Sequence, residues 1–140
     1  MNALQANTTG LRNTALGQDS LYSNTTANDN TAVGKNSLET NTTGAENTTV
    51  GRSSLGANTT GGNNVAQQAL RTNTTASFNT AFGSNALKLN AAGQRNSALG
   101  KSTLHENTTG SYNTASGMEA MYSNTTGAEN AAFGYQALFS

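Results

Sequence analysis

The tripeptide Asn-Thr-Thr recurs at almost constant intervals along the whole chain, and this regularity restricts the folds open to it. Successive copies begin 17 residues apart, except for one interval of 15 residues between Asn58 and Asn73. One copy is replaced by Asn-Ala-Ala-Gly at Asn90. Such a fixed period is typical of repeat proteins, in which each unit packs against its neighbours and buries little surface alone.

Aligned units read Asn-Thr-Thr-Gly, two variable residues, Asn-Thr-Ala, an apolar residue, Gly, two variable residues, Ala/Ser-Leu and two more variable residues. The leucine column contains Leu4, Leu21, Leu38, Leu55, Leu70, Leu87, Leu104, Met121 and Leu138. The first asparagine column contains Asn7, Asn24, Asn41, Asn58, Asn73, Asn90, Asn107 and Asn124. The second asparagine column contains Asn13, Asn30, Asn47, Asn64, Asn79, Asn96, Asn113 and Asn130.

A 17-residue unit is too short for the helical-hairpin repeats, whose units exceed about 30 residues. It suits one coil of an all-β repeat, a β-solenoid of about eight coils with short strands and glycine corners. We expect residues 1–140 to form one such array without caps, its two ends covered by neighbouring domains or by another copy. The segment from the Gly to Ala/Ser-Leu could instead form a short helical turn in each coil, because Ala and Leu are good helix formers.

Stacked coils place like residues above one another, and this explains the asparagines. Asn tolerates the left-handed conformation of corners, and its amide bonds the backbone or the next Asn in a ladder. We therefore expect both asparagine columns to be structural. We also expect one Leu, one further apolar residue and one Ala to be buried in each coil. Because so small a core stabilises a coil weakly, we expect an oligomer in which the coils of several chains share a core.

The 15-residue unit at residues 58–72 reads NTTGGNNVAQQALRT and lacks both the large apolar residue and the following Gly. We expect a pinched corner between Val65 and Gln67, with the neighbouring coils keeping their register. A tolerated short loop explains such a unit better than a functional hinge does.

Charge and composition exclude several classes of function. Seven Lys and Arg balance seven Asp and Glu, and no block of like charge provides the footprint of a nucleic-acid binder. There is no cysteine, so disulfides and thiolate metal sites are excluded. No apolar run is long enough to span a bilayer, and a signal peptide's basic and apolar regions are not seen. Hydrophobic residues make up only 34%, which by itself would suit disorder, but the strict period argues for a fold.

Catalytic and metal-binding patterns are not apparent. The single histidine, His105, lies in a column of unrelated residues, and the seven acids form neither an Asp-rich calcium loop nor a Glu-x-x-His motif. The Gly61-Gly62 pair lacks the Lys-Ser/Thr of a phosphate loop. We therefore predict no enzymatic activity, no catalytic residues, no metal and no cofactor.

The units "NTTGLRNTALGQDSL", "NTAFGSNALKLN" and "NAAFGYQALFS" resemble the repeats of phage and bacterial tail-fibre or tail-spike proteins that carry an endosialidase-type chaperone. They are similar, more loosely, to the head repeats of trimeric autotransporter adhesins. The resemblance covers essentially all of the chain. It implies a trimeric β-structured fibre segment used for attachment, in a virion tail or at a cell surface, and it brings no catalytic residues.

Two other functions stay open at this stage. The chain could be a filament subunit that stacks end to end. It could also bind ice through its threonine columns, although Ala91 and Ala92 interrupt both columns. Besides other copies of itself, a cell-surface glycan or receptor is a conceivable partner, since sugar rings can stack on the aromatic columns, Phe78 with Tyr112 and Tyr22 with Tyr122 and Phe139. Isolated or interchain packing explains these aromatics more simply.

The Asn-Thr-Thr copies also match the acceptor pattern for N-glycosylation. Asn41 belongs to the first asparagine column, which supplies seven of the eight sequons. Asn47 belongs to the second column and matches only because Thr49 replaces the usual Ala. We interpret the sequons as by-products of the ladders.

Overall fold

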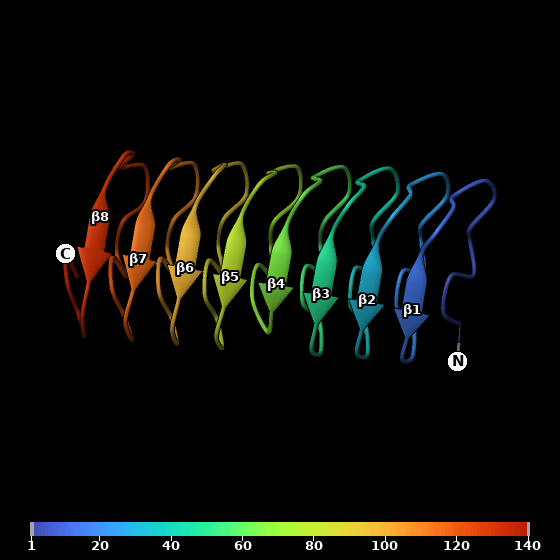
Figure 1. The fold of residues 1–140 in the computed structure, drawn as a ribbon, viewed down its shortest axis with the longest axis horizontal. Helices are drawn as coiled ribbons and strands as arrows, with labels where there is room; N and C mark the ends of the chain where they lie inside the picture. The colour runs from blue at the N-terminus through green and yellow to red at the C-terminus, as the bar shows by residue number, and fades with distance from the viewer. Residues whose placement is uncertain (1, 140) are drawn as a thin grey trace.

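The computed structural model describes residues 2–139; Met1 and Ser140, the two ends of the expected array, lie outside the described residues. Eight short strands form one parallel sheet in chain order (Figure 1). Their bounds are β1 Thr14–Leu16, β2 Thr31–Val33, β3 Thr48–Val50, β4 Val65–Gln67, β5 Thr80–Phe82, β6 Ser97–Leu99, β7 Thr114–Ser116 and β8 Ala131–Phe133. The predicted all-β solenoid with coils of about 17 residues is confirmed. None of residues 2–139 is helical, so the alternative of a helical turn in each coil is excluded.

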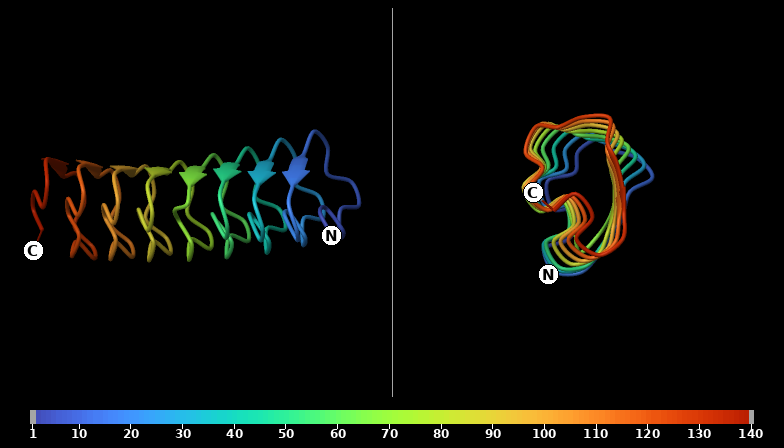
Figure 2. Two further views of the ribbon diagram at one scale, coloured as in Figure 1. Left: turned by 90° about the horizontal axis from the view of Figure 1, so that it is seen from below. Right: turned by 90° about the vertical axis from the view of Figure 1, so that its left-hand side faces the viewer.

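The coils stack into a straight rod, with one strand per coil along one side (Figure 1). Viewed end-on, their outlines nearly superimpose (Figure 2). The outline is straight along the strands and indented on the opposite side, where the chain passes through the turns after each strand (Figure 2). The two long sides of the rod therefore differ in shape and can serve different purposes.

Each strand pairs like residues with like, for example Ala15 with Ala32 and Leu16 with Val33. Because side chains alternate along a strand, the middle residue points inward and its two neighbours point outward. Ala32 is fully buried at such a middle position. Thr49 takes the same place in β3, and its hydroxyl is satisfied by Ser37 Oγ at 2.6 Å. The sheet thus contributes only small side chains to the interior.

The leucine column fills the rest of the core. Six of its leucines, from Leu21 to Leu104, are fully buried, and Met121 is nearly so. Leu4 is half-buried and Leu138 is exposed, because each lies in an end coil with a neighbour on one side only. The Ala, Ser or Thr that precedes the leucine is buried as well, as at Ala69 and Ala86, so the core of each inner coil consists of one Leu or Met and two small residues.

These leucines adopt left-handed backbone conformations, with φ between 47° and 54°. That conformation disrupts any helical turn and costs about 1 kcal/mol or more for a residue other than Gly. The backbone bonds run between coils instead: the Leu21 N–H donates to Ser37 O in the next coil at 3.0 Å. Stacking therefore outweighs the local preference of Ala-Leu for a helix.

The expectation that a second large apolar residue is buried in each coil is wrong within a single chain. This residue is the third of each strand, so alternation points it outward. Leu16 is 65% exposed and Phe133 is 70% exposed. Val50, Phe82 and Leu99 are exposed in the same column.

The shortened unit keeps its strand. β4 pairs in register with both neighbours, Val65 with Thr48 and with Thr80, so the expected pinch between Val65 and Gln67 is wrong in position. The unit is shorter because the turn after Gln67 has two residues fewer than in the other coils. In this turn Gln68 has φ 51°, and its N–H donates to Val50 O at 3.0 Å. Pairing on two sides fixes the strand, whereas the turn can shorten. The neighbouring coils keep their register, as predicted.

Candidate assembly surface

The first asparagine column forms a continuous side-chain ladder inside the rod. Each Asn donates from Nδ2 to Oδ1 of the preceding Asn, over seven bonds of 2.8–3.1 Å from Asn124 back to Asn7. The same Nδ2 also donates to the backbone oxygen three residues on, as from Asn58 to Gly61 O at 2.8 Å. Both amide hydrogens are therefore used within the coil stack, and the ladder crosses the 15-residue unit unbroken.

The second asparagine column is bonded differently. Its Oδ1 atoms accept the backbone N–H of the next Asn in the column, in seven bonds of 3.0 Å. Its Nδ2 atoms donate to a backbone oxygen of the following coil, as from Asn47 to Gly61 O at 3.0 Å. Asn24 to Asn107 in the first column and Asn30 to Asn113 in the second are fully buried. These buried amides are hydrogen-bonded to the backbone and to one another, so they are unavailable to a ligand.

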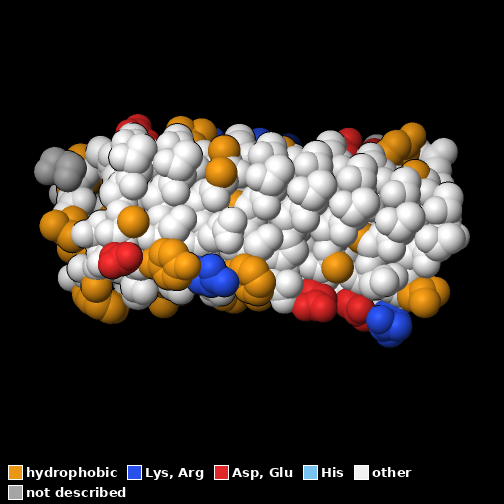
Figure 3. All heavy atoms as spheres, turned by 90° about the horizontal axis from the view of Figure 1, so that it is seen from above, with side chains coloured by type: hydrophobic (Ala, Val, Ile, Leu, Met, Phe, Trp, Pro, Cys, Tyr) orange, Lys and Arg blue, Asp and Glu red, His pale blue; other side chains and the backbone are white. Residues whose placement is uncertain are grey.

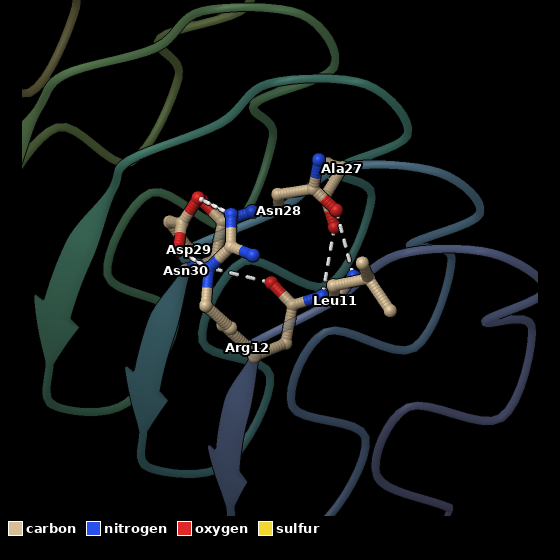
Figure 4. A network of polar contacts seen from close by, with 7 residues as sticks. Leu11, Arg12, Ala27, Asn28, Asp29 and Asn30 are labelled. Carbon is tan, nitrogen blue, oxygen red and sulfur yellow. Dashed lines mark hydrogen bonds and ion pairs between the residues drawn. The ribbon is translucent and has the colours of Figure 1, made fainter.

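The turns before the strands carry contacts between exposed side chains. Arg12 and Asp29 form an ion pair in consecutive coils, and Leu11 N donates to Asn28 Oδ1 at 2.7 Å beside it (Figure 4). The hydrogen bond from the Arg12 guanidinium lowers the pKa of the Asp29 carboxyl. Figure 3 looks onto this side of the rod, where charged and apolar side chains gather in a row along one edge. The row reinforces the stack from outside.

Aromatic side chains of neighbouring coils stack on one another or on a cation. The Arg95 guanidinium lies 5.1 Å from the centre of the Phe78 ring and 5.5 Å from that of Tyr112. On another side, the Tyr122 ring stacks on His105 at 4.7 Å and on Phe139 at 5.4 Å. Since their faces are occupied by each other, these rings offer little stacking surface to a sugar.

One side of the sheet faces away from the core, and we call it the outer sheet face. It consists of the first and third residues of the eight strands. One column is mostly Thr, and the other is the apolar column of Leu16, Val33, Val50, Phe82, Leu99 and Phe133, with Gln67 and Ser116 between them. No charged residue lies on this face. An uncharged strip with large exposed apolar side chains is a candidate interface.

The outer sheet face is hollowed near the C-terminal end of the rod. A hollow of about 360 Å³ opens over Ser116, between Leu99 and Phe133. The small Ser side chain leaves this space because its apolar neighbours in the column are larger. A complementary apolar side chain from another molecule would fit there.

The two threonine columns that suggested ice binding lie outside the strands, and they are not equivalent. Hydroxyls of the first column donate to carbonyls of the following coil, as from Thr42 Oγ1 to Thr59 O at 3.0 Å. Thr8, Thr25, Thr59 and Thr108 make the corresponding bond. The second column, which includes Thr43, is exposed. A flat face with two free threonine columns is therefore not formed here.

His105 lies against Tyr122 in the turns after the strands. Its Nδ1 is buried and has no hydrogen-bond partner among residues 2–139. Burial lowers the pKa of His105, Lys88 adds to this, and Glu106 opposes it. Among the described residues, no three His, Asp or Glu side chains come together as metal ligands would. Residues 2–139 contain no helix of the length and apolar character needed to cross a bilayer.

The comparisons with known proteins leave the family open. No protein-family model, no curated protein and no solved structure matches the chain. The assembly surface therefore has to be argued from its own geometry. Sequence reasoning missed the outer sheet face, although the two-residue alternation in Thr-Ala-apolar contained the signal for it.

Proposed function

We propose that this chain is a non-enzymatic structural segment of a fibre, whose outer sheet face packs against the same face of two further copies in a homotrimer. The observation that carries the proposal is the row of exposed large apolar side chains along an otherwise regular sheet. Leu16, Leu99 and Phe133 each leave more than half of their surface exposed. Apolar surface of this extent along one face favours association.

The composition of the face favours identical partners. Because it carries no charge, several copies can bring this face together without electrostatic repulsion. The columns run along the rod axis over about 34 Å, given about 4.8 Å per coil step. Parallel copies in register would place Leu against Leu and Phe against Phe along the whole length. A shared apolar seam of this kind would supply the burial that one narrow coil lacks.

A rigid rod with internal ladders suits a spacer in an attachment structure, and the resemblance of the repeats to tail-fibre proteins agrees with that role. We therefore place the segment in a phage tail fibre or a bacterial surface attachment structure, in a virion tail or outside the cell. Its work there is mechanical. It would hold other domains at a distance and in a fixed orientation.

Sedimentation of the chain tests the proposal. The wild-type chain should sediment as a trimer, and the double variant Leu99→Asp/Phe133→Asp, which puts charge on the outer sheet face, should sediment as a monomer. Leu11→Asp is the matched control, since Leu11 is also highly exposed but lies outside the sheet. It should remain trimeric. A wild-type monomer at all concentrations would overturn the trimer, and polymers of unlimited length would favour the end-to-end filament instead.

A further inference from the structure

The charges of the chain are segregated along the rod. No Asp or Glu occurs between Glu46 and Glu106, whereas five of the seven cations lie there. Residues 1–46 contain two cations and four acids, and residues 106–140 contain three acids and no cation. The net charge is therefore −2 at the N-terminal part, +5 in the middle and −3 at the C-terminal part. A neutral chain thus presents a cationic middle section.

Four of the middle cations belong to the turns that follow the strands, whereas Arg95 precedes one. Arg52, Arg71, Lys88 and Lys101 occur in the turns that follow β3, β4, β5 and β6, one cation in each coil. Arg71 and Lys88 share one column of the repeat, directly after the leucine, and lie in consecutive coils about 4.8 Å apart along the axis; Arg52 and Lys101 belong to a second column, directly after the glycine that ends the strand. The turns after the strands make up the indented side of the rod (Figure 2), and hollows open between their side chains. We call the hollowed part of this side the back groove.

Two adjoining hollows make up the back groove, and Arg71 lines both. The larger, of about 520 Å³, lies where Gly56 has no side chain, with Arg71 and Lys88 at its wall. The smaller, of about 200 Å³, lies between Arg52 and Ser84. It opens where the short coil lacks two turn residues. The irregular unit therefore creates space beside two guanidinium groups.

None of these four cations forms an ion pair with an acidic group of the described residues. Arg12 and Asp29 form the only ion pair among residues 2–139. Glu39 is the only acid that lines the larger hollow, at its N-terminal side, and it forms no ion pair with Arg71 or Lys88. The remaining lining is rich in hydroxyls and amides, from Ser53, Thr72, Ser84, Asn85 and Gln68. The groove thus combines unpaired cations with neutral hydrogen-bonding groups.

We propose that the back groove binds an acidic polysaccharide, whose carboxylate or sulfate groups lie against Arg52, Arg71 and Lys88. Guanidinium groups bind such oxyanions with paired hydrogen bonds. Sugar hydroxyls take the places opposite the Ser, Thr, Asn and Gln side chains. A single-stranded nucleic acid fits less well, because base stacking needs aromatic side chains and none lines either hollow. No residue of the outer sheet face lines either hollow, so the site does not depend on the proposed trimer.

Binding of fluorescent oligogalacturonate, which carries carboxylates, and of fluorescent heparin, which carries sulfates, tests the proposal by anisotropy at low ionic strength. At least one should bind, and about 0.5 M NaCl should abolish binding. Arg52→Gln/Arg71→Gln should weaken binding about tenfold. Arg12→Gln/Arg95→Gln is the matched control, because it removes the same charge from the turns before the strands, away from the two hollows. It should change the affinity less than about twofold.

A second variant tests the hollow itself and leaves every charge in place. Insertion of Gly-Ser after Gln67 restores a 17-residue coil and fills the smaller hollow, so it should weaken binding as well. Thermal unfolding of each variant checks that the rod is intact. Failure of both saccharides to bind, an equal loss in the matched control, or tighter binding of an oligothymidylate would overturn the assignment. If the insertion variant bound with wild-type affinity, the short coil would not be part of the binding site.

Discussion

Asn30 and Asn41, which belong to different asparagine columns and to consecutive coils, donate to the same atom. Each Nδ2 lies 2.9 Å from Gly44 O. Asn47 and Asn58 share Gly61 O in the same way. A carbonyl oxygen has two lone pairs, so both bonds can form at once. The two ladders are thereby linked in every coil, and a break in one of them affects the bonds of the other.

The substitution Asn58→Ala should be strongly destabilising. Asn58 Nδ2 donates to Asn41 Oδ1 at 2.8 Å, and its Oδ1 accepts from Asn73 Nδ2 at 2.9 Å. Removal of the amide leaves Asn41 Oδ1 without a donor and one of the two N–H groups of Asn73 Nδ2 without an acceptor, both buried, which costs about 3 kcal/mol or more in unfolding free energy. Gly61 O keeps its bond from Asn47. Urea unfolding at one fixed protein concentration measures the loss.

Asn124→Ala is the matched control. Asn124 is the last residue of the same ladder and is only half-buried. Water can replace its bond to Asn107 Oδ1, so a loss of about 1 kcal/mol is expected. Equal losses at Asn58 and Asn124 would show that the ladder gains nothing from being buried and continuous.

A glycine substitution at Glu46 should stabilise the rod relative to alanine. Glu46 is exposed and has φ 61°, a conformation that costs any residue with a Cβ about 1 kcal/mol. Glu46→Gly should therefore unfold at a higher urea concentration than Glu46→Ala. Gln18 is exposed and does not have a positive φ. Here the order should reverse, because Gly destabilises the folded chain by about 0.5–1 kcal/mol relative to Ala. The same order at both sites would refute the backbone argument.

Features of this structure that follow from the repeat pattern could be predicted from the sequence, whereas features imposed by contacts between coils could not. Asparagine and glycine recur because stacking requires them at fixed places, so the period and the β-solenoid could be read from the sequence. The conformation of Leu55 could not, since Ser-Leu favours a helix locally and only the bonds to neighbouring coils impose φ 49°. The outward position of Leu99 was predictable from alternation alone. The back groove was not, because it arises from a deletion whose effect depends on which segment is free to shorten.

The stability of the rod should fall as the pH is lowered from about 7 to about 5, and His105 should account for part of the fall. Burial lowers the pKa of His105 in the folded chain, so below about 6.5 the unfolded chain binds the proton more strongly. Stability from this group is present in full above that pH and is lost as the pH drops toward the folded pKa. Unfolding midpoints at pH 7.5 and 5.5 measure the change.

His105→Phe should reduce this pH dependence. A phenyl ring can keep the stack on Tyr122, as Phe139 does from the other side, but it does not titrate. The Asp29 carboxyl, whose pKa is lowered, loses its contribution only at more acid pH. A pH dependence of the same size in the Phe variant would exclude His105 as its source.

The fully buried sequon asparagines, from Asn24 to Asn107, should carry no glycan in folded material. A glycan attaches at Nδ2, and Asn41 Nδ2 is fully buried and donates to both Asn24 Oδ1 and Gly44 O. Mass spectrometry of the chain from a glycosylating host should therefore find these asparagines unmodified in molecules that unfold cooperatively. Glycosylated molecules should be aggregated.

Val65→Thr provides the positive control, because it completes a sequon at Asn63 without disturbing a ladder. Asn63 is exposed, and the other residues that share the position of Val65 are mostly Thr. Asn63 should then accept a glycan while the rod stays folded, since its side chain points away from the core. A glycan on Asn41 in the folded fraction, with or without one on Asn63, would contradict the burial of the first ladder.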